Sequence, residues 1–246
     1  VENIIKAKGL RFVLARGYPS PWGQAAKAMA EYKGLQSRFA ALKVRQDNPK
    51  ITKWSHVNSA PVMAWDNESP INKWDDILLL LERLQPERPL VPTDLGARIK
   101  FFGLAHAICG NLGFGWNRRL AGIHAGVTSG INPGEFGEKY GYNTRDGEQA
   151  EPRSIDFLNT LTAILKSQAE LGSRFILGES VTALDFYWAA FSNLALLQSA
   201  QDCPVDASIR QRFEKISPSF SKAIDPILIE HRDHIMRQYF ILPMEL

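Results

Sequence analysis

The sequence has little cysteine and little net charge. Its two cysteines, Cys109 and Cys203, stand alone, with no CxxC pair and no His/Cys spacing of the kind that binds zinc. We therefore expect neither a disulfide framework nor a metal site, and interpret both cysteines as small core residues. The formal charge of +3 is too small and too scattered to predict nucleic-acid binding.

Long apolar stretches are also missing. The longest run, residues 77–81, is far too short to cross a membrane, and the first ten residues lack the apolar centre of a signal peptide. We therefore expect a cytoplasmic protein with no membrane partner. The 246 residues are 45% apolar and 22% charged, an ordinary composition with room for one large domain or two small ones.

What the sequence does contain is a helix marked at both ends, within residues 18–35. Ser20 suits the N-cap, Pro21 the first helical position, and Gly34 the residue that ends the last turn. A strand-like run at residues 10–14 precedes it. A helix N-terminus that follows a strand attracts anions, because free N–H groups and the positive end of the helix dipole point at the ligand. Ser20 is thus either a simple cap or a hydroxyl that donates to a substrate thiolate.

The rest of the first 85 residues alternates strands and helices. We predict a second strand at 41–45, a polar loop at 46–59, a strand at 60–65 that begins with Pro61, a turn at 66–70, a short returning strand from Ile71 and a helix at 75–84. The Ala60–Pro61 bond suits a cis peptide. Three prolines in residues 85–93 then predict an extended linker.

Beyond the linker the pattern is helical. We predict helices at 94–119, 154–173, 182 to about 200, 208–216 and 219–235. The third begins with a capping box, in which Thr182 caps and Asp185 reaches back to the Thr182 N–H, while Val181 and Phe186 occupy the positions of a hydrophobic staple. This helix is apolar nearly all round, so it belongs at the centre of its domain.

Residues 126–152 differ from the rest of the chain. They are rich in Gly, Asn, Asp and Glu and contain Phe136, Tyr140 and Tyr142. We interpret them as a long loop. It is either a lid over a cleft or a surface excursion that packs its aromatics on the helices.

In this order the features resemble the cytosolic glutathione transferases. Four segments carry the resemblance, which covers nearly the whole chain: Ser20-Pro21-Trp22-Gly23-Gln24, Ala60-Pro61-Val62, residues 71–84 and residues 178–186. The resemblance implies an α+β thioredoxin-like domain at residues 1–86, a linker at 87–94 and an all-α domain at 95–246. It also implies a symmetric homodimer.

The resemblance assigns roles to individual residues. Ser20 would be catalytic and would stabilise the thiolate of glutathione, the co-substrate, which attacks an electrophilic, mostly apolar small molecule. The glutathione-binding residues would be Trp22, Lys53, Ala60, Pro61, Lys73 and Trp74, and the acceptor-substrate pocket would contain Tyr18, His106 and Trp116, with the pair Arg118-Arg119 nearby. Thr182 and Asp185 would be structural.

Four of these residues also have a structural interpretation. Lys53 can be a solvated lysine, His106 a hydrogen-bonded core histidine and Trp116 a core aromatic. Tyr18 can support the turn before Ser20 instead of lining a pocket.

One motif departs from the family. An acidic or amide residue followed by serine normally opens the third helix and holds the γ-glutamyl carboxylate of glutathione. Lys73 and Trp74 stand there instead, and Lys73 could pair with that carboxylate. The departure motivates an alternative, a non-catalytic protein of the same fold that binds an apolar ligand or a protein partner. Disulfide exchange is disfavoured because serine occupies the nucleophile position.

Overall fold

The computed structural model describes residues 1–245. Three strands, β1 (Leu10–Ala15), β2 (Ser37–Leu42) and β3 (Val62–Trp65), form one sheet in the order β2-β1-β3. β1 runs parallel to β2 and antiparallel to β3. The helices are α1 (Glu2–Ile5), α2 (Pro21–Tyr32), α3 (Pro49–Ser55), α4 (Trp74–Leu84), α5 (Leu95–Cys109), α6 (Phe114–Thr128), α7 (Gly134–Lys139), α8 (Thr144–Glu170), α9 (Ala183–Phe191), α10 (Ala207–Glu214), α11 (Pro218–Lys222) and α12 (Pro226–Tyr239).

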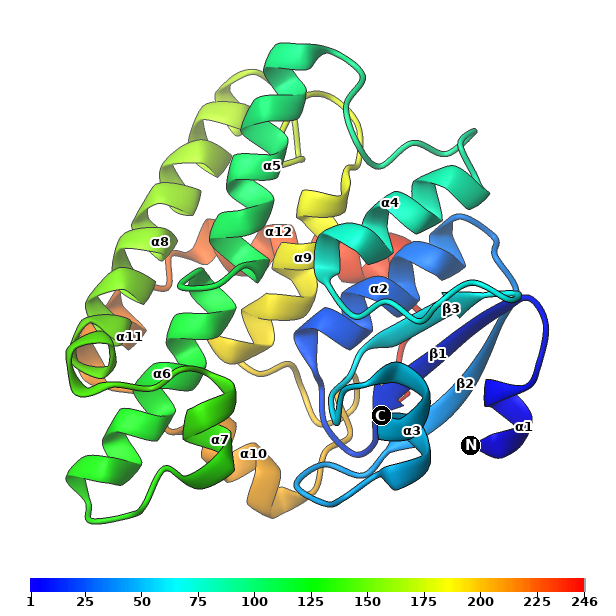
Figure 1. The fold of residues 1–246 in the computed structure, drawn as a ribbon. Helices are drawn as coiled ribbons and strands as arrows, with labels where there is room; N and C mark the ends of the chain where they lie inside the picture. Colours follow the sequence, from blue (N-terminus) through cyan, green and yellow to red (C-terminus); the bar gives the residue numbers. More distant parts are fainter. Residues whose placement is uncertain (246) are drawn as a thin grey trace.

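The sheet is covered on both faces, which follows from the alternation of side chains along β1. Phe12 points into the large core with α2 and α4, whereas Val13 packs with Ile51 of α3 on the other face. Figure 1 shows this sheet with its helices on one side of the molecule and the long helices α5, α6 and α8 on the other. The fold class predicted from the sequence, a thioredoxin-like α+β part followed by helices, is confirmed.

Several predicted boundaries are wrong in this first part. The second strand lies at Ser37–Leu42 and not at 41–45, because Ala40 and Leu42 supply its buried positions. The loop predicted at 46–59 contains α3, whose Pro49 stands at the first helical turn. The returning strand is reduced to a single bridge, in which Ile71 and Met63 exchange two hydrogen bonds of 2.8 Å.

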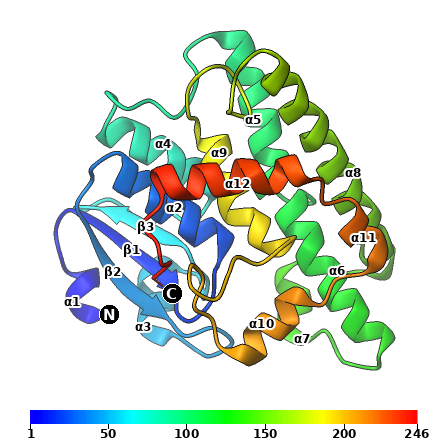
Figure 2. The ribbon, with the colours of Figure 1, turned by 180° about the vertical axis from the view of Figure 1, so that it is seen from behind.

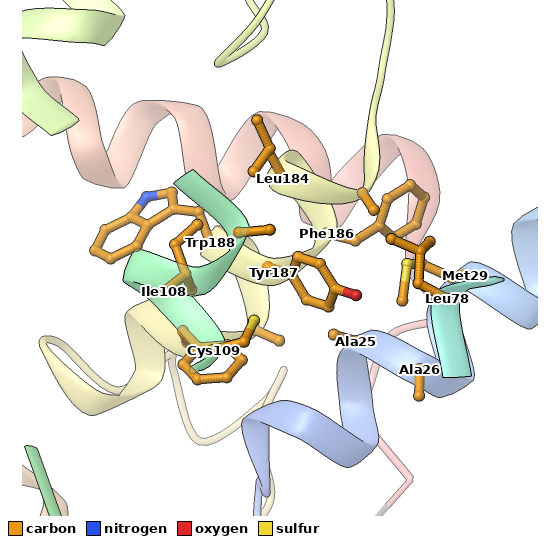
Figure 3. Close-up of a cluster of buried hydrophobic side chains, with 14 of the residues drawn as sticks. Ala25, Ala26, Met29, Leu78, Ile108, Cys109, Leu184, Phe186, Tyr187 and Trp188 are labelled. Carbon is orange, nitrogen blue, oxygen red and sulfur yellow. The ribbon is translucent and has the colours of Figure 1, made fainter. Parts of the chain in front are cut away.

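One hydrophobic core joins the sheet part to the helical part. Figure 3 shows Tyr187 of α9 between Ala25 of α2, Leu78 of α4 and Cys109 of α5, all of them buried. The Tyr187 hydroxyl lies 3.3 Å from the carbonyl oxygen of Trp74 and donates to it. The two parts therefore share their apolar interior.

The capping box of α9 forms as predicted. The Asp185 carboxylate accepts hydrogen bonds from the Thr182 N–H (2.8 Å) and the Ile176 N–H (2.9 Å), and its Oδ1 lies 2.9 Å from Nε2 of His231. Every residue of α9 is buried, so the helix is central, as its composition predicts. Figure 2, the view from behind, shows α12, which carries His231, crossing in front of α9. The helix is shorter than predicted and ends at Phe191, followed by a 3-10 turn at Ser192–Leu194.

The predicted linker is irregular but firmly attached. The ammonium group of Lys33, whose side chain is fully buried, lies 2.7 Å from each of three oxygens: the carbonyls of Gln85 and Arg88 and Oε1 of Glu82. The buried Leu90 donates its N–H to the same Glu82 carboxylate and accepts from the N–H of Ala183. The linker is thus tied to both α2 and α9.

The predicted helix at 94–119 is two helices, α5 and α6. A side chain at Gly113 would lie 2.6 Å from the His106 carbonyl oxygen, so the chain turns there only with glycine. Where the sequence predicts two final helices, the structure has three, α10, α11 and α12.

The prediction of a long loop at residues 126–152 is wrong. Most of it is helical, because α6 continues to Thr128, α7 spans Gly134–Lys139 and α8 begins at Thr144. Pro152 lies inside α8 at an exposed position. Asn143 caps α8 by accepting a hydrogen bond of 2.9 Å from the Asp146 N–H. No helix within residues 1–245 combines the length and apolar character that crossing a membrane requires.

Candidate active site

The sheet register brings three predicted segments to one edge. Val13 pairs with Val62 in antiparallel register, so the end of β1, which leads to Ser20, lies beside the start of β3, which follows Pro61. Ile71 bridges to Met63, so the start of α4 comes back to the same region. Residues far apart in the sequence therefore meet where β1 ends.

Ser20 occupies the N-cap position of α2, as predicted. Its backbone is extended (φ −64°, ψ 112°), and its carbonyl accepts from the Gln24 N–H at 2.9 Å. Its hydroxyl, however, makes no capping hydrogen bond. A Cβ at Gly23 would lie 3.3 Å from the Leu14 side chain, so glycine allows the start of α2 to pack closely on β1. The hydroxyl and the first-turn N–H groups are thus available to a ligand.

Trp22 lies between the two parts of the molecule. Its indole N–H donates to the Cys109 carbonyl oxygen (2.9 Å), and its ring meets Phe191 edge to face at 4.7 Å. A Cβ at Gly115 would come within 2.3 Å of Phe191 and 3.0 Å of Trp22, so α6 can approach here only with glycine. The indole N–H of Trp22 is consequently engaged by the protein itself.

The cis-proline turn is present. The Ala60–Pro61 bond is cis, and Pro61 is buried directly before β3. Lys53 lies on α3 and is exposed.

Lys73 and Trp74 open α4, as the alignment of motifs predicts. Lys73 stands at the N-cap position, exposed and without a side-chain cap. Trp74 turns toward α9, where its ring meets Tyr187 edge to face at 5.8 Å. The lysine is therefore free to meet an anion, while the tryptophan side chain helps to join the two parts.

The three residues predicted for the acceptor pocket lie in different settings. Tyr18 is half-buried in the turn before Ser20. His106 is exposed and its ring covers Gly110, which contradicts its interpretation as a core histidine. Trp116 is half-buried, and its indole N–H donates to the Tyr140 carbonyl oxygen at 3.0 Å.

A cavity of about 390 Å³ lies elsewhere. It is lined by the residues that follow α8, among them Arg174 and Glu179, and by His234 of α12. It is at the N-terminal end of α9, whereas Trp22 packs at the C-terminal end. Among the residues that the structure describes, no three His, Cys, Asp or Glu side chains gather in a way that could hold a metal ion.

Comparison of the structure with solved structures decides the fold. A glutathione S-transferase from Methylobacterium radiotolerans, in complex with glutathione sulfonate, is similar over 95% of this chain and 93% of its own, with a TM-score of 0.64 and 16% identity. The chain has the glutathione transferase fold.

Two further structures show how widely this glutathione transferase fold is shared. A rice glutathione transferase in complex with glutathione matches 96% of this chain and 93% of its own, with a TM-score of 0.62 and 16% identity. The nitrogen regulation fragment of the yeast prion protein Ure2p matches 94% and 93%, with a TM-score of 0.66 and 12% identity. No family model and no curated protein sequence matches the chain.

Proposed function

We propose that the chain is a glutathione transferase-like enzyme in which Ser20 stabilises the thiolate of glutathione. The observation that carries the proposal is the Ser20 hydroxyl, which stands at the N-terminus of α2 without a capping hydrogen bond. A hydroxyl donor and a helix N-terminus both favour a thiolate over a thiol. The thiolate sulfur would attack an electrophilic carbon of an apolar acceptor held against the helical part.

The glutathione backbone would lie along the sheet edge. The cis Ala60–Pro61 turn would present its backbone to the cysteinyl unit, and Lys73 would pair with the γ-glutamyl carboxylate. Lys53 would reach the glycyl carboxylate from α3. Two of the similar solved structures hold glutathione or its sulfonate, which supports this choice of ligand.

A second candidate is a non-catalytic protein of this fold. Trp22 and Trp74 direct their rings into the contact between the two parts and not toward a ligand. The similarity to the nitrogen regulation fragment of Ure2p is consistent with this alternative. Titration with glutathione separates the two candidates, because saturable binding at millimolar concentration or below is expected only of the enzyme.

Substitution of Ser20 tests the chemistry. Ser20→Ala should leave the free energy of unfolding nearly unchanged, because the hydroxyl does not cap α2. It should raise the pKa of the bound glutathione thiol by about 1 or more, since a hydrogen bond to a charged group contributes about 1.5–3 kcal/mol. The thiolate absorbance of the complex, titrated with pH, measures this. Ser208→Ala, on exposed α10, is the matched control. An identical titration for Ser20→Ala and the unsubstituted protein would refute the role of Ser20.

A further inference from the structure

A cavity of about 390 Å³ lies between the connection that joins α8 to α9 and the helix α12. Residues 171–175 and Glu179 line it from the connection, and His234 lines it from α12. Sites for small molecules have volumes of about 300 Å³ and above, so one small organic molecule would fit here. The cavity lies at the N-terminal end of α9, whereas Trp22 packs at the other end, so it is separate from the candidate active site.

Hydrogen bonds fix the wall of the cavity that the connection forms. The Ser173 hydroxyl donates to the Gly178 carbonyl oxygen at 2.6 Å and accepts from the Phe175 N–H at 3.1 Å. The Ile176 N–H donates to the buried Asp185 carboxylate at 2.9 Å. The wall therefore has its shape before a ligand binds, which reduces the entropy that binding costs.

The cavity carries one charge of each sign. Arg174 and Glu179 are both exposed on its wall, and neither forms an ion pair with any other part of residues 1–245. Burial and, second, the positive charge of Arg174 lower the pKa of His234, so this imidazole is neutral at pH 7 and adds no charge. A ligand that matches the cavity therefore has a carboxylate for Arg174 and an ammonium group for Glu179.

Apolar side chains complete the lining. The Phe175 ring is half-buried, with its centroid 6.4 Å from that of the His234 ring. The Leu171 side chain, by contrast, is 80% exposed to water. An apolar group on the ligand would cover part of both side chains, and removing their surface from water would favour binding.

We propose that the cavity binds a free aromatic amino acid in its zwitterionic form. Arg174 pairs with the α-carboxylate and Glu179 with the α-ammonium group, while the ring of the amino acid lies against Phe175 and Leu171. No covalent step takes place at this site, and binding there does not require Ser20. The proposal therefore stands whether or not the chain is a glutathione-dependent enzyme.

Phenylalanine and two analogues that each lack one charge test the proposal. L-phenylalanine, hydrocinnamate (no ammonium group) and phenethylamine (no carboxylate) are titrated into the isotope-labelled full chain, and the backbone amide signals are followed by NMR. We expect phenylalanine to shift the signals of residues 171–179. It should bind about tenfold or more tightly than either analogue, because each analogue leaves one charge of the cavity unpaired. Equal affinities, or shifts confined to other parts of the chain, would overturn the proposal.

Substitutions on the wall identify which charge meets which group of the ligand. Arg174→Gln should remove the preference for phenylalanine over phenethylamine, and Glu179→Gln should remove the preference over hydrocinnamate. Both variants should keep the melting temperature of the unsubstituted protein, because both side chains are exposed. Arg212→Gln on α10 and Glu148→Gln on α8, two exposed residues outside the cavity, are matched controls and should keep both preferences. An unchanged preference in either wall variant would overturn the proposal.

Competition with glutathione separates the proposed ligand class from glutathione, whose γ-glutamyl end is also a zwitterion. Glutathione should not displace phenylalanine from the signals of residues 171–179, because it has no ring to lie against Phe175. Displacement at these signals would show that the cavity is a glutathione site and that the proposed class is wrong. Ser20→Ala should bind phenylalanine as the unsubstituted protein does, and a loss of binding in this variant would contradict a separate site.

Discussion

At the scale of single residues, the two cysteines are protected by their surroundings. Burial raises the pKa of the Cys109 thiol well above its usual range, with the charge of Asp75 adding to the effect. Burial also raises the pKa of Cys203 to about 11, with Asp202 adding to the shift and Arg210 opposing it. Because the thiolate is the reactive form, neither cysteine suits redox chemistry near neutral pH.

These raised values predict a pH dependence of stability. Above about pH 8.5 the thiols of the unfolded chain lose their protons while those of the folded chain keep them, so the free energy of unfolding should fall as pH rises toward 11. Urea titrations at pH 7.5 and pH 10 measure the change. Cys203→Ala should reduce it, and a slope unaffected by that substitution would contradict our assignment. Both thiols should also react with a disulfide reagent only after unfolding.

At the scale of elements, α9 depends on one carboxylate. Asp185 accepts from two backbone N–H groups and contacts His231, all in the buried interior. Asp185→Ala leaves these donors without a partner and should lower the free energy of unfolding by roughly 3 kcal/mol or more. Thr182→Ala should cost only about 1 kcal/mol.

Chemical denaturation of both variants provides the measurement. The folded fraction of Thr182→Ala should retain the glutathione affinity of the unsubstituted protein, because the box lies at the opposite end of α9 from Trp22. A melting temperature unchanged by Asp185→Ala would show that the box does not support the helix.

The elements that are predictable from the sequence are those with signals at their ends. α2 has Ser20-Pro21, and α9 has Thr182 and Asp185, so local chemistry alone indicates where they start. α7 and the start of α8 are missed because their glycines suggest a loop. Gly147 does not mark a loop. It is required by close packing, because a Cβ there would lie 2.7 Å from both His124 and Tyr142. Asn143 and Asp146, spaced as a cap pair, are the signal that could have located α8.

The candidate site is predictable only in part, for a similar reason. Ser20 and Pro61 are marked by local sequence, and a register of strands then brings them together. The hydrogen bond from the Trp22 indole N–H to the Cys109 carbonyl oxygen is a tertiary contact, which no local spacing in the sequence predicts.

At the scale of the whole molecule, an apolar surface remains uncovered. Leu95 and Ile99, one helical turn apart on α5, are 70% and 66% exposed. We predict that two copies of the chain form a symmetric dimer and cover this surface, since isolated monomers rarely leave large apolar side chains grouped in water. Light scattering should give twice the single-chain mass of 27.6 kDa.

Charge introduced on that surface tests the prediction. Ile99→Glu should yield a folded single chain, because the side chain already faces solvent in one copy. Ile241→Glu, at another exposed isoleucine, should not change the mass. A mass near 27.6 kDa for the unsubstituted protein would contradict the dimer.

The buried ammonium group of Lys33 should hold the protein together after proteolytic cleavage of the linker. Pro86 and Glu87 are exposed, yet the residues on either side of them, Gln85 and Arg88, are both held at 2.7 Å by the same Lys33 Nζ. If a protease cut the chain between Pro86 and Glu87, the residues beside both new ends would still be hydrogen-bonded to Lys33 Nζ. The two fragments would also share one hydrophobic core. The nicked protein should migrate as one species in a native gel and separate into two fragments only in detergent.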